Sequence, residues 1–338
     1  MIEFFSGLFS ILLWLPLGLV GYFNQLLAPL SESELLQKWQ PGIVYSYKQA
    51  ESLGLNPEQT YSAILDELQP KYLRIIAYWD RIEKNRGSYD FSELDFQMDE
   101  AEKKGVQTTL ILGRKVPRWP ECHLPAWYVD LDSAQREKAV LGLIEQVVKR
   151  YQNYANLEYW QLENEIFFTG FGNCPKEDNG LFKSELSLLK SLDSRPVLNT
   201  SSGELDTWLR SFIYGDKVGV SVYQRFFVTT PFFKIGLDYP LPPLFYHTKA
   251  KLFQIFFKKD ILITEFQLEP WLSQAPAKVS PEEQFRELDL AHFKKYINYA
   301  LHTRIPRVYF WGVEWWYWLK QNGYQEFFSY VQQNIFNH

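Results

Sequence analysis

Two glutamates, each belonging to an apolar run, have the residue type and the spacing to do chemistry together. Glu165 closes the run Leu157–Glu165, and Glu265 lies in the run Asp260–Gln267, about 100 residues further along the chain. An apolar run that ends in a carboxylate is typical of a barrel strand whose C-terminal end carries a catalytic side chain. Two such carboxylates on different strands can act as general acid/base and nucleophile, the pair that breaks a glycosidic bond.

This chemistry requires that the two carboxyl groups differ in protonation. One must stay protonated to donate to the leaving oxygen, and the other must be ionised to attack the anomeric carbon. Different surroundings must therefore push their pKa values apart. One glutamate at a strand end could equally be a solvated loop residue or half of a structural ion pair. Two of them, with Asn164 beside the first, favour the catalytic interpretation, and the deeper Glu163 is expected to support the site without reacting.

The elements that must position these residues follow a repeating pattern. After Pro41 the chain alternates short β-branched or aromatic runs with amphipathic helices, which predicts parallel strands with helical crossovers. Eight units in about 300 residues match a (β/α)8 TIM barrel of the α/β class, formed as one domain by residues 42–338. A doubly wound open sheet is the alternative, but no Gly-rich loop follows the first strand. The expected strands are 42–46, 72–79, 107–113, 157–165, 196–200, 218–223, 260–267 and 307–312.

Helix signals lie between these strands. Pro57 suits the first position of a helix, and Ser92 with Asp95 resembles a capping box. The long stretch 226–243 is expected to be a loop that forms a lid, a cleft wall or, through its phenylalanines, a membrane contact. The other expected helices are 92–105, 133–151, 179–193, one that contains Trp208, 246–257, 281–302 and one that ends the chain.

The ordered set of motifs resembles a known group of enzymes. Asn164-Glu165 on the fourth strand with Glu265 on the seventh is similar to clan A of the retaining glycoside hydrolases. Residues 79–83, 87–91 and 94–95 are similar to a pattern in family 42 and related β-glycosidases, and Pro117-Arg-Trp-Pro after the third strand fits the same picture. The likeness covers the barrel, extends to family 5-like enzymes, and implies a retaining β-glycosidase.

The resemblance also implies roles for single residues. Glu165 would be the general acid/base and Glu265 the nucleophile of a double displacement. Asn164 would bind the sugar 2-hydroxyl, and Arg74 would keep Glu265 ionised. Tyr223 would donate to Glu265, unless it is a core tyrosine. Trp311 would form the floor of the sugar subsite.

Further aromatic and acidic residues fall at the predicted strand ends. Flat rings gathered on one rim favour stacking on sugars, although any single one could be a core residue. Glu314 and Glu269 could bind sugar hydroxyls or be loop charges. The rim tryptophans are Trp79, Trp119, Trp127, Trp271, Trp315, Trp316 and Trp318.

The N-terminus differs in kind from the barrel. No charged residue lies between Phe4 and Leu30, and the apolar run 4–23 is long enough to span a bilayer. We expect residues 1–30 to be a transmembrane anchor and residues 31–41 to be a linker. A cleaved signal peptide and an apolar helix packed on the barrel are the alternatives.

Orientation rests on weak and opposing signals. Lys38 and Lys48 follow the apolar run, which by the positive-inside rule favours a cytoplasmic barrel. Against it stand a polysaccharide-type site and the chain's two cysteines, Cys122 and Cys174, which follow adjacent strands and could form a disulfide. We therefore expect a membrane-anchored, extracytoplasmic domain. Free thiols are the alternative for the cysteines.

Composition excludes several other classes of function. A net charge of −5 argues against nucleic-acid binding. The five histidines and two cysteines form no metal-ligand motif, and no organic cofactor is implied. The expected partner is an oligo- or polysaccharide: a β-linked glucan, mannan or galactoside. A non-catalytic glycan-binding barrel and a transglycosylase that uses the same residues are the alternative functions.

Overall fold

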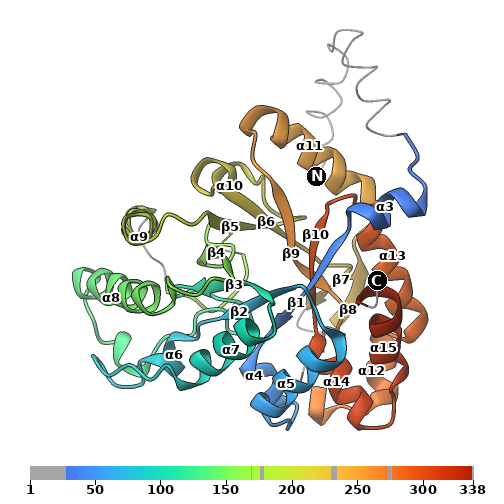
Figure 1. Cartoon of the computed structure of the whole chain (residues 1–338), viewed down its shortest axis with the longest axis horizontal. Coiled ribbons are helices and arrows are strands. Elements are labelled where there is room, and N and C mark those ends of the chain that lie inside the picture. The colour runs from blue at the N-terminus through green and yellow to red at the C-terminus, as the bar shows by residue number, and fades with distance from the viewer. Residues whose placement is uncertain are drawn as a thin grey trace.

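The structure of the protein is a computed structural model. It describes residues 28–168, 170–175, 179–229, 234–272, 274 and 276–336. Eight parallel strands close into a barrel in the order β1-β10-β9-β6-β5-β4-β3-β2 (Figure 1). The barrel strands are β1 Gln40–Tyr45, β2 Tyr72–Ile76, β3 Gln107–Leu112, β4 Leu157–Leu162, β5 Val197–Ser202, β6 Lys217–Val222, β9 Ile261–Gln267 and β10 Arg307–Trp311. The TIM-barrel prediction is therefore confirmed.

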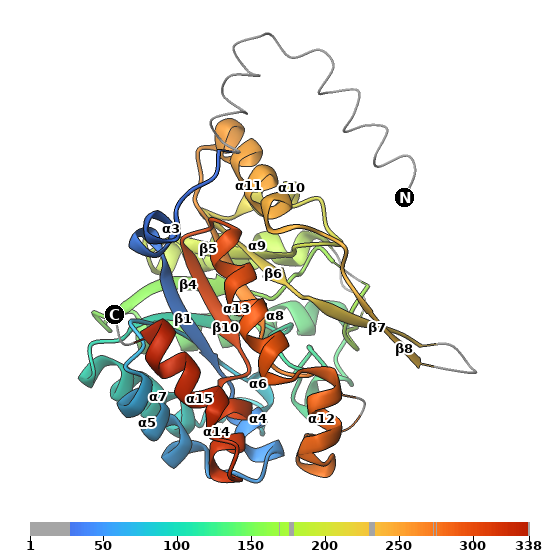
Figure 2. The same cartoon turned by 90° about the vertical axis from the view of Figure 1, so that its right-hand side faces the viewer.

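Helices surround the barrel and return the chain to the N-terminal ends of the strands. In Figure 2, α3, α10 and α11 lie at one end of the molecule, and α4, α12 and α14 lie at the other. The α-helices are α3 Glu32–Lys38, α4 Tyr47–Ser52, α5 Pro57–Leu68, α6 Trp79–Ile82, α7 Ser92–Lys103, α8 Ser133–Tyr151, α9 Asn179–Leu192, α10 Leu209–Tyr214, α11 Pro243–Phe257, α12 Pro281–Glu287, α13 Leu290–His302, α14 Val313–Gln321 and α15 Glu326–Val331. Short turns of other helix types are Ala126–Tyr128, Pro276–Lys278 and Gln332–Phe336.

Two separate apolar cores follow from this closure. The larger packs the outer faces of the strands against the helices. The smaller fills the barrel interior and includes Tyr72, Ile111, Leu262 and Tyr309. Position 219 has room only for glycine, because a Cβ there would clash with Thr264 Cγ2 at 2.5 Å. The barrel interior is therefore a packed core rather than an open channel.

A β-bulge in β9 breaks the alternation of side chains along that strand. Val220 pairs with Ile263 and Ser221 pairs with Glu265, so one residue of β9 has no partner at this step. Ile263 and Phe266 both face the outer core. A bulge lets two successive side chains point the same way. Thr264 lies against the barrel interior and Glu265 points into the mouth, although simple alternation would separate them.

Several predicted elements need correction. The segment expected as a linker contains α3, which Ser31 and Glu34 cap reciprocally and whose Leu35 is buried. The expected helix 281–302 is two helices, because Leu288 is extended and Asp289 starts α13 by capping His292.

Two further signals at helix starts were misleading. Ser92 and Asp95 form no capping box, since the Ser92 amide donates to Asp90. Trp208 lies just before α10 with a positive φ of 70°, and its indole donates to the Ser202 carbonyl.

The long stretch after β6 contains an antiparallel hairpin, β7 Arg225–Thr229 and β8 Lys234–Asp238. The expected continuous loop at 226–243 is therefore wrong. Phe232 and Phe233 lie outside the described residues, as do the side chains of Phe226 and Phe227, so their expected membrane contact stays a prediction.

The expected transmembrane anchor at 1–30 lies almost entirely outside the described residues, which begin at Ala28. From that point on, no described helix has the length and apolarity needed to cross a membrane.

The disulfide prediction is confirmed. Cys122 in the loop after β3 and Cys174 in the loop after β4 are joined, with their Cα atoms 5.2 Å apart. Adjacent strands place these loops side by side at the C-terminal end of the barrel. The bond therefore ties together the two loops that flank Glu165.

Candidate active site

Glu265 is held by a cation and a phenol. Arg74 Nη1 lies 2.8 Å from Glu265 Oε1, and Tyr223 Oη donates to Oε2 at 2.9 Å. Each carboxylate oxygen thus accepts one bond from a fixed donor. Both contacts stabilise the negative charge, the form that a nucleophile needs. The expected contacts of Arg74 and Tyr223 with Glu265 are present.

Arg74 itself is completely buried inside the barrel. Its Nε donates to Gln161 Oε1 at 2.7 Å, and its Nη2 donates to Asn164 Oδ1 at 3.0 Å. Its Nη1 also donates to the Thr264 carbonyl at 3.1 Å. A buried guanidinium is tolerable only when it is paired and bonded in this way. Arg74 therefore fixes Asn164 and Glu265 relative to each other.

Glu165 lies three residues beyond β4, on a backbone bent by two left-handed residues. Glu163 and Glu165 have φ of 58° and 45°, values that cost energy for residues other than glycine and that cluster at functional sites. The Glu165 amide donates to Thr200 Oγ1 at 2.8 Å, and its Oε1 accepts from the Ser221 hydroxyl. These contacts aim its carboxyl across the mouth towards β6.

The surroundings of Glu165 change the pKa of its carboxyl group. Burial, and secondly the nearby charge of Glu265, raise the pKa of Glu165 to about 7. The Ser221 hydrogen bond and Lys115 oppose this rise. A carboxyl with a pKa of about 7 is about half protonated at neutral pH, so it can both give and take a proton. Glu165 therefore has the property that a general acid/base needs, beside a carboxyl that accepts from Arg74 and Tyr223.

Glu163 supports the site, as expected. It is completely buried and accepts the backbone N–H groups of Arg114 at 2.9 Å and Lys115 at 2.6 Å. Gly113 is required there, because a Cβ would lie 2.6 Å from the Glu163 carboxyl carbon. Glu163 therefore clamps the start of the loop that follows β3.

Glu121 is a third carboxyl that the sequence analysis missed. Only 6% of the residue is exposed, and its Oε2 accepts from Asn164 Nδ2 at 3.2 Å. Burial first, and then the charges of Glu265 and Glu165, raise its pKa well above the ordinary value. It lies well inside the loop after β3 rather than directly at the strand end, so strand patterns alone could not find it. The Arg-Trp-Pro-Glu-Cys stretch in a long strand-end loop was the available signal.

Arg118, on the same loop, reaches to the opposite side of the barrel mouth. Its guanidinium lies 3.8 Å from the centroid of the Trp311 ring and pairs with Glu269 and Glu314. Trp311 Nε1 also donates to Glu269 at 2.9 Å. The ring expected to floor the sugar subsite is therefore stacked against a protein cation in this structure. The loop after β3, residues 113–132, therefore crosses the barrel mouth, and it is called the strap below.

Two expected sugar contacts cannot touch a ligand in this structure. Glu314 is completely buried, where it accepts from the Ser46 amide and from Arg118, and burial raises its pKa to about 7. Trp79 is also completely buried and donates to Glu83 at 2.7 Å. Trp315 and Trp316 likewise belong to the outer core, because α14 turns those rings inwards.

Other rim aromatics form a row that leads to the carboxyl pair. Trp119, 67% exposed, lies 5.8 Å from Phe171, and Phe171 lies 5.7 Å from Trp271 (distances between ring centroids). Trp271 in turn lies 5.3 Å from Tyr223, the residue that donates to Glu265. Trp127 and Trp318 are half-buried against the outer core instead. Of the seven tryptophans that were expected to stack on sugars, only Trp119 and Trp271 belong to this row.

No role was assigned to His123, which follows β3. It is buried, with its Nδ1 2.8 Å from Lys48 Nζ, and burial lowers its pKa to about 4. Among the described residues, no group of three or more His, Cys, Asp or Glu side chains is arranged to hold a metal ion.

Comparisons with known proteins agree with this fold. No protein-family model and no curated protein sequence matches the chain. Among solved structures, GH5_18 from Bifidobacterium longum subsp. longum has a TM-score of 0.56 and 13% identity, over 81% of this chain and 69% of that chain. Xylanase 10B from Thermotoga petrophila RKU-1, in complex with xylobiose, has a TM-score of 0.54 and 15% identity, over 84% and 86%.

A β-galactosidase from the Antarctic haloarchaeon Halorubrum lacusprofundi has a TM-score of 0.53 and 13% identity, over 80% of this chain. The chain spans about half the length of the two β-galactosidases that it matches, 50% and 52%. At these identities the likeness establishes the fold. The resemblance to the clan A TIM barrel, drawn from the motifs, is confirmed at that level.

The raised pKa of Glu165 predicts a pH dependence. A general acid works only while protonated, so kcat/KM should fall as the pH rises above about 7. Replacing Glu265 by Gln removes a negative charge that raises this pKa, so the pKa of Glu165 should drop. Carboxyl ¹³C NMR titration measures it directly, with the exposed Glu137→Gln variant as control. An unchanged Glu165 pKa in Glu265→Gln would contradict the coupling.

Glu121 gives a second prediction. Gln at position 121 keeps an oxygen for Asn164 Nδ2 and is neutral, like a protonated carboxyl, so Glu121→Gln should fold and retain most activity. Ala leaves a buried amide donor unpaired, which should cost about 1–3 kcal/mol of stability and lower kcat/KM about tenfold. Denaturant unfolding and steady-state kinetics measure both. A Glu121→Gln enzyme with no activity would mean that the residue acts in its ionised form.

Proposed function

We propose that the protein is a retaining glycoside hydrolase that cleaves β-linked glycans by double displacement. The observation that carries the proposal is the unequal pair at the barrel mouth. Glu265 accepts from Arg74 and Tyr223, whereas Glu165 has its pKa raised to about 7. Fixed environments that push two carboxyls apart assign the acid and the nucleophile.

The two steps follow from this assignment. Glu265 Oε attacks the anomeric carbon while Glu165 gives its proton to the glycosidic oxygen, so the glycosidic bond breaks and a glycosyl ester forms. The ionised Glu165 then takes a proton from water as that water attacks the same carbon. The ester breaks and Glu265 leaves as a carboxylate. Arg74 remains beside Glu265 and stabilises the charge that it carries before and after the covalent step.

A carbohydrate substrate is supported by the aromatic row of Trp119, Phe171, Trp271 and Tyr223, which offers flat apolar faces. Proteins with the same fold are described with sugars: GH5_18 from Streptomyces cattleya with GlcNAc, and the Thermotoga petrophila xylanase with xylobiose. We extend this to a β-linked glucan, mannan or galactoside as the substrate of this chain.

Trapping the intermediate tests the function. In Glu165→Ala, hydrolysis should slow by roughly 10²–10⁴-fold, because proton donation and water activation are lost. With an aryl β-glycoside, whose leaving group needs little protonation, a glycosyl adduct should accumulate on Glu265 and appear in intact-protein and peptide mass spectra. Glu137→Ala, on the exposed face of α8, is the control.

Three outcomes would overturn or narrow the proposal. Inverted product stereochemistry without an adduct would replace double displacement by single displacement. Products longer than the substrate would indicate transglycosylation by the same two residues. Binding without turnover across a panel of β-glycans, or a fully active Glu265→Ala variant, would remove the hydrolase assignment.

We further propose that residues 4–23 anchor the protein in a membrane and that the barrel is extracytoplasmic. The uncharged apolar run supports the anchor, and the Cys122–Cys174 disulfide supports an oxidising compartment.

The redox state of the cysteines tests the compartment. In cells, an alkylating reagent added without a reductant should leave Cys122 and Cys174 unmodified, because both sulfurs are in the disulfide. In the chain-entropy description, a disulfide that closes a loop of 52 residues stabilises the folded protein by about 4 kcal/mol. The double Cys→Ser variant should therefore unfold at a lower denaturant concentration. Alkylated cysteines in freshly lysed cells would place the barrel in a reducing compartment instead.

A further inference from the structure

Helices α10 and α11 expose an apolar surface at the end of the barrel remote from the catalytic rim. Phe256 is 73% exposed, with Leu252 one turn before it, and Ile255 lies beside both. On the neighbouring α10, Leu209 and Ile213 are also one turn apart and exposed. Phe212 stacks on Phe253 between the helices, so the five side chains form one surface, here called the α10–α11 patch.

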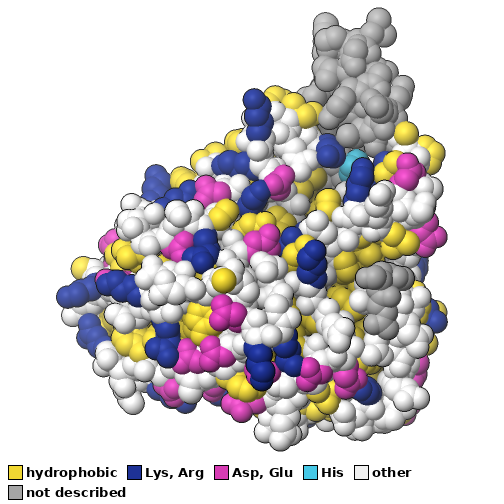
Figure 3. Space-filling model, in the orientation of Figure 1, with side chains coloured by type: hydrophobic (Ala, Val, Ile, Leu, Met, Phe, Trp, Pro, Cys, Tyr) yellow, Lys and Arg dark blue, Asp and Glu magenta, His cyan; other side chains and the backbone are white. Residues whose placement is uncertain are grey.

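Basic residues border this patch. Lys251 lies one turn before Ile255, and Lys258 follows the helix in an exposed position. Figure 3 shows basic and hydrophobic side chains side by side over α10 and α11. Exposed apolar surface of this kind marks a protein or membrane contact, and a basic border favours a negatively charged partner.

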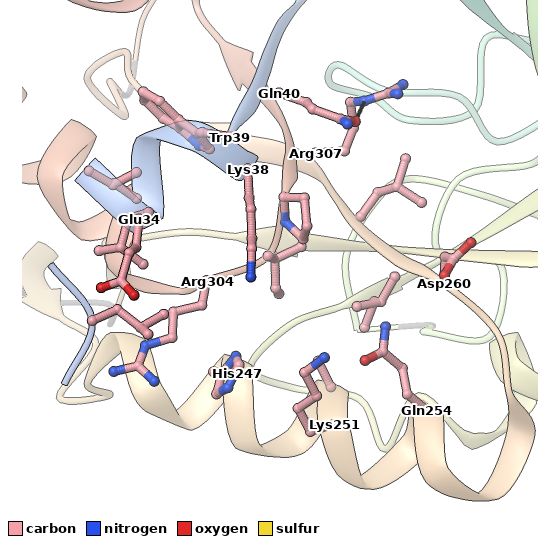
Figure 4. A pocket seen from close by; sticks show the side chains of 18 of the residues that line it. Glu34, Lys38, Trp39, Gln40, His247, Lys251, Gln254, Asp260, Arg304 and Arg307 are labelled. Carbon is pink, nitrogen blue, oxygen red and sulfur yellow. Dashed lines mark hydrogen bonds between the residues drawn. The ribbon is translucent and has the colours of Figure 1, made fainter. Parts of the chain in front are cut away.

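A cavity of about 560 Å³ opens beside the patch, between α3, α11 and the first residues of β9 and β10. Its charged lining is four cationic against two acidic side chains, a net +2 on a chain of net charge −5. Figure 4 shows Lys38 from α3 and Lys251 from α11 on its two sides, with Arg304 and His247 nearby. The lining charges are Lys38, Lys251, Arg304, Arg307, Glu34 and Asp260.

Several of these charges are already balanced within the protein. Arg307 pairs with Glu158, and Asp260 pairs with Lys217. Within the described part of the chain, neither Lys38 nor Lys251 forms an ion pair. Two lysines on opposite walls of an apolar and basic cavity suit a phosphate group.

The first described residues of the chain lie at the same place. Leu30, two residues after the first described residue, lines the cavity. The 27 residues before Ala28 contain the uncharged stretch 4–23. The patch, the cavity and the first described residues therefore lie at one end of the barrel, where α3, α10 and α11 lie together (Figure 2).

We infer that this end of the barrel rests on an anionic phospholipid bilayer. The α10–α11 patch enters the interfacial region, while Lys38 and Lys251 bind a headgroup phosphate at the cavity mouth. Glu165 and Glu265 lie at the C-terminal ends of the strands, the opposite end of the barrel, so this docking turns the catalytic rim away from the lipid. The inference does not depend on the glycosidase assignment, but it implies a glycan in solution rather than one linked to lipid.

Site-directed quenching tests the docking. The full chain carrying Phe256→Cys, labelled with a fluorophore while the native disulfide stays intact, is placed in phosphatidylglycerol/phosphatidylcholine vesicles that contain brominated lipid. The matched control is Val129→Cys, 62% exposed in the loop after β3. The label at position 256 should be quenched by the lipid, and the label at position 129 should not. Equal quenching at both positions would overturn the docking.

Two further measurements separate the alternatives. Lys38→Gln with Lys251→Gln should lower quenching at position 256 about twofold in anionic vesicles and leave it unchanged in pure phosphatidylcholine. The control is Lys103→Gln, an exposed lysine on α7. Both headgroups carry a phosphate, so equal quenching in the two lipids before mutation would show that the net negative charge is not recognised and would overturn the anionic docking. A label at position 256 that lipid leaves unquenched and that aqueous iodide cannot reach would show that residues 4–27 cover the patch, which overturns the lipid contact.

Discussion

The ion pair between Arg74 and Glu265 is the interaction on which the site depends. A guanidinium with no solvent exposure must have every charge balanced nearby, and the barrel supplies Glu265, Gln161, Asn164 and the Thr264 carbonyl. Those partners come from β4 and β9, on different sides of the barrel. One buried cation therefore sets the positions of both Glu265 and the amide of Asn164, next to Glu165. The bulge in β9 is what makes the pair possible, because it turns Glu265 inwards.

The strap formed by the loop after β3 is held at three places. Glu163 clamps its start, Arg118 binds the far rim through Glu269 and Glu314, and the disulfide ties its return to the next loop. These three attachments keep Glu121 in contact with Asn164 despite the nearby carboxyl groups of Glu265 and Glu165. Trp311 and Arg118 both bind Glu269, which is consistent with the guanidinium lying over the Trp311 ring.

The two ends of the barrel carry different kinds of side chains. The C-terminal end gathers carboxyls and the groups that donate to them, so its geometry is fixed by hydrogen bonds. The opposite end exposes Phe256 and Ile255 near Lys38 and Lys251, two lysines that form no ion pair with another described residue. Because helices in a barrel of this kind run back from the catalytic end, the C-terminal end of α11 necessarily lies far from Glu265. A contact there can hold the molecule without touching the reaction.

The sequence by itself determined the barrel and the strand-end positions of Glu165 and Glu265, because apolar runs and strand ends are local patterns. The contacts of Arg74 and Tyr223 with Glu265 were expected from the family resemblance instead. Helix α8 was predicted at its observed bounds, Ser133–Tyr151, since its amphipathic period is regular. Only the tertiary structure decided the roles of Glu121, Arg118 and Trp79. Whether a loop carboxyl meets a strand-end amide, or a rim tryptophan turns inwards, depends on contacts between segments distant in sequence. Periodicity contains no information about such contacts, which only the closed barrel brings together.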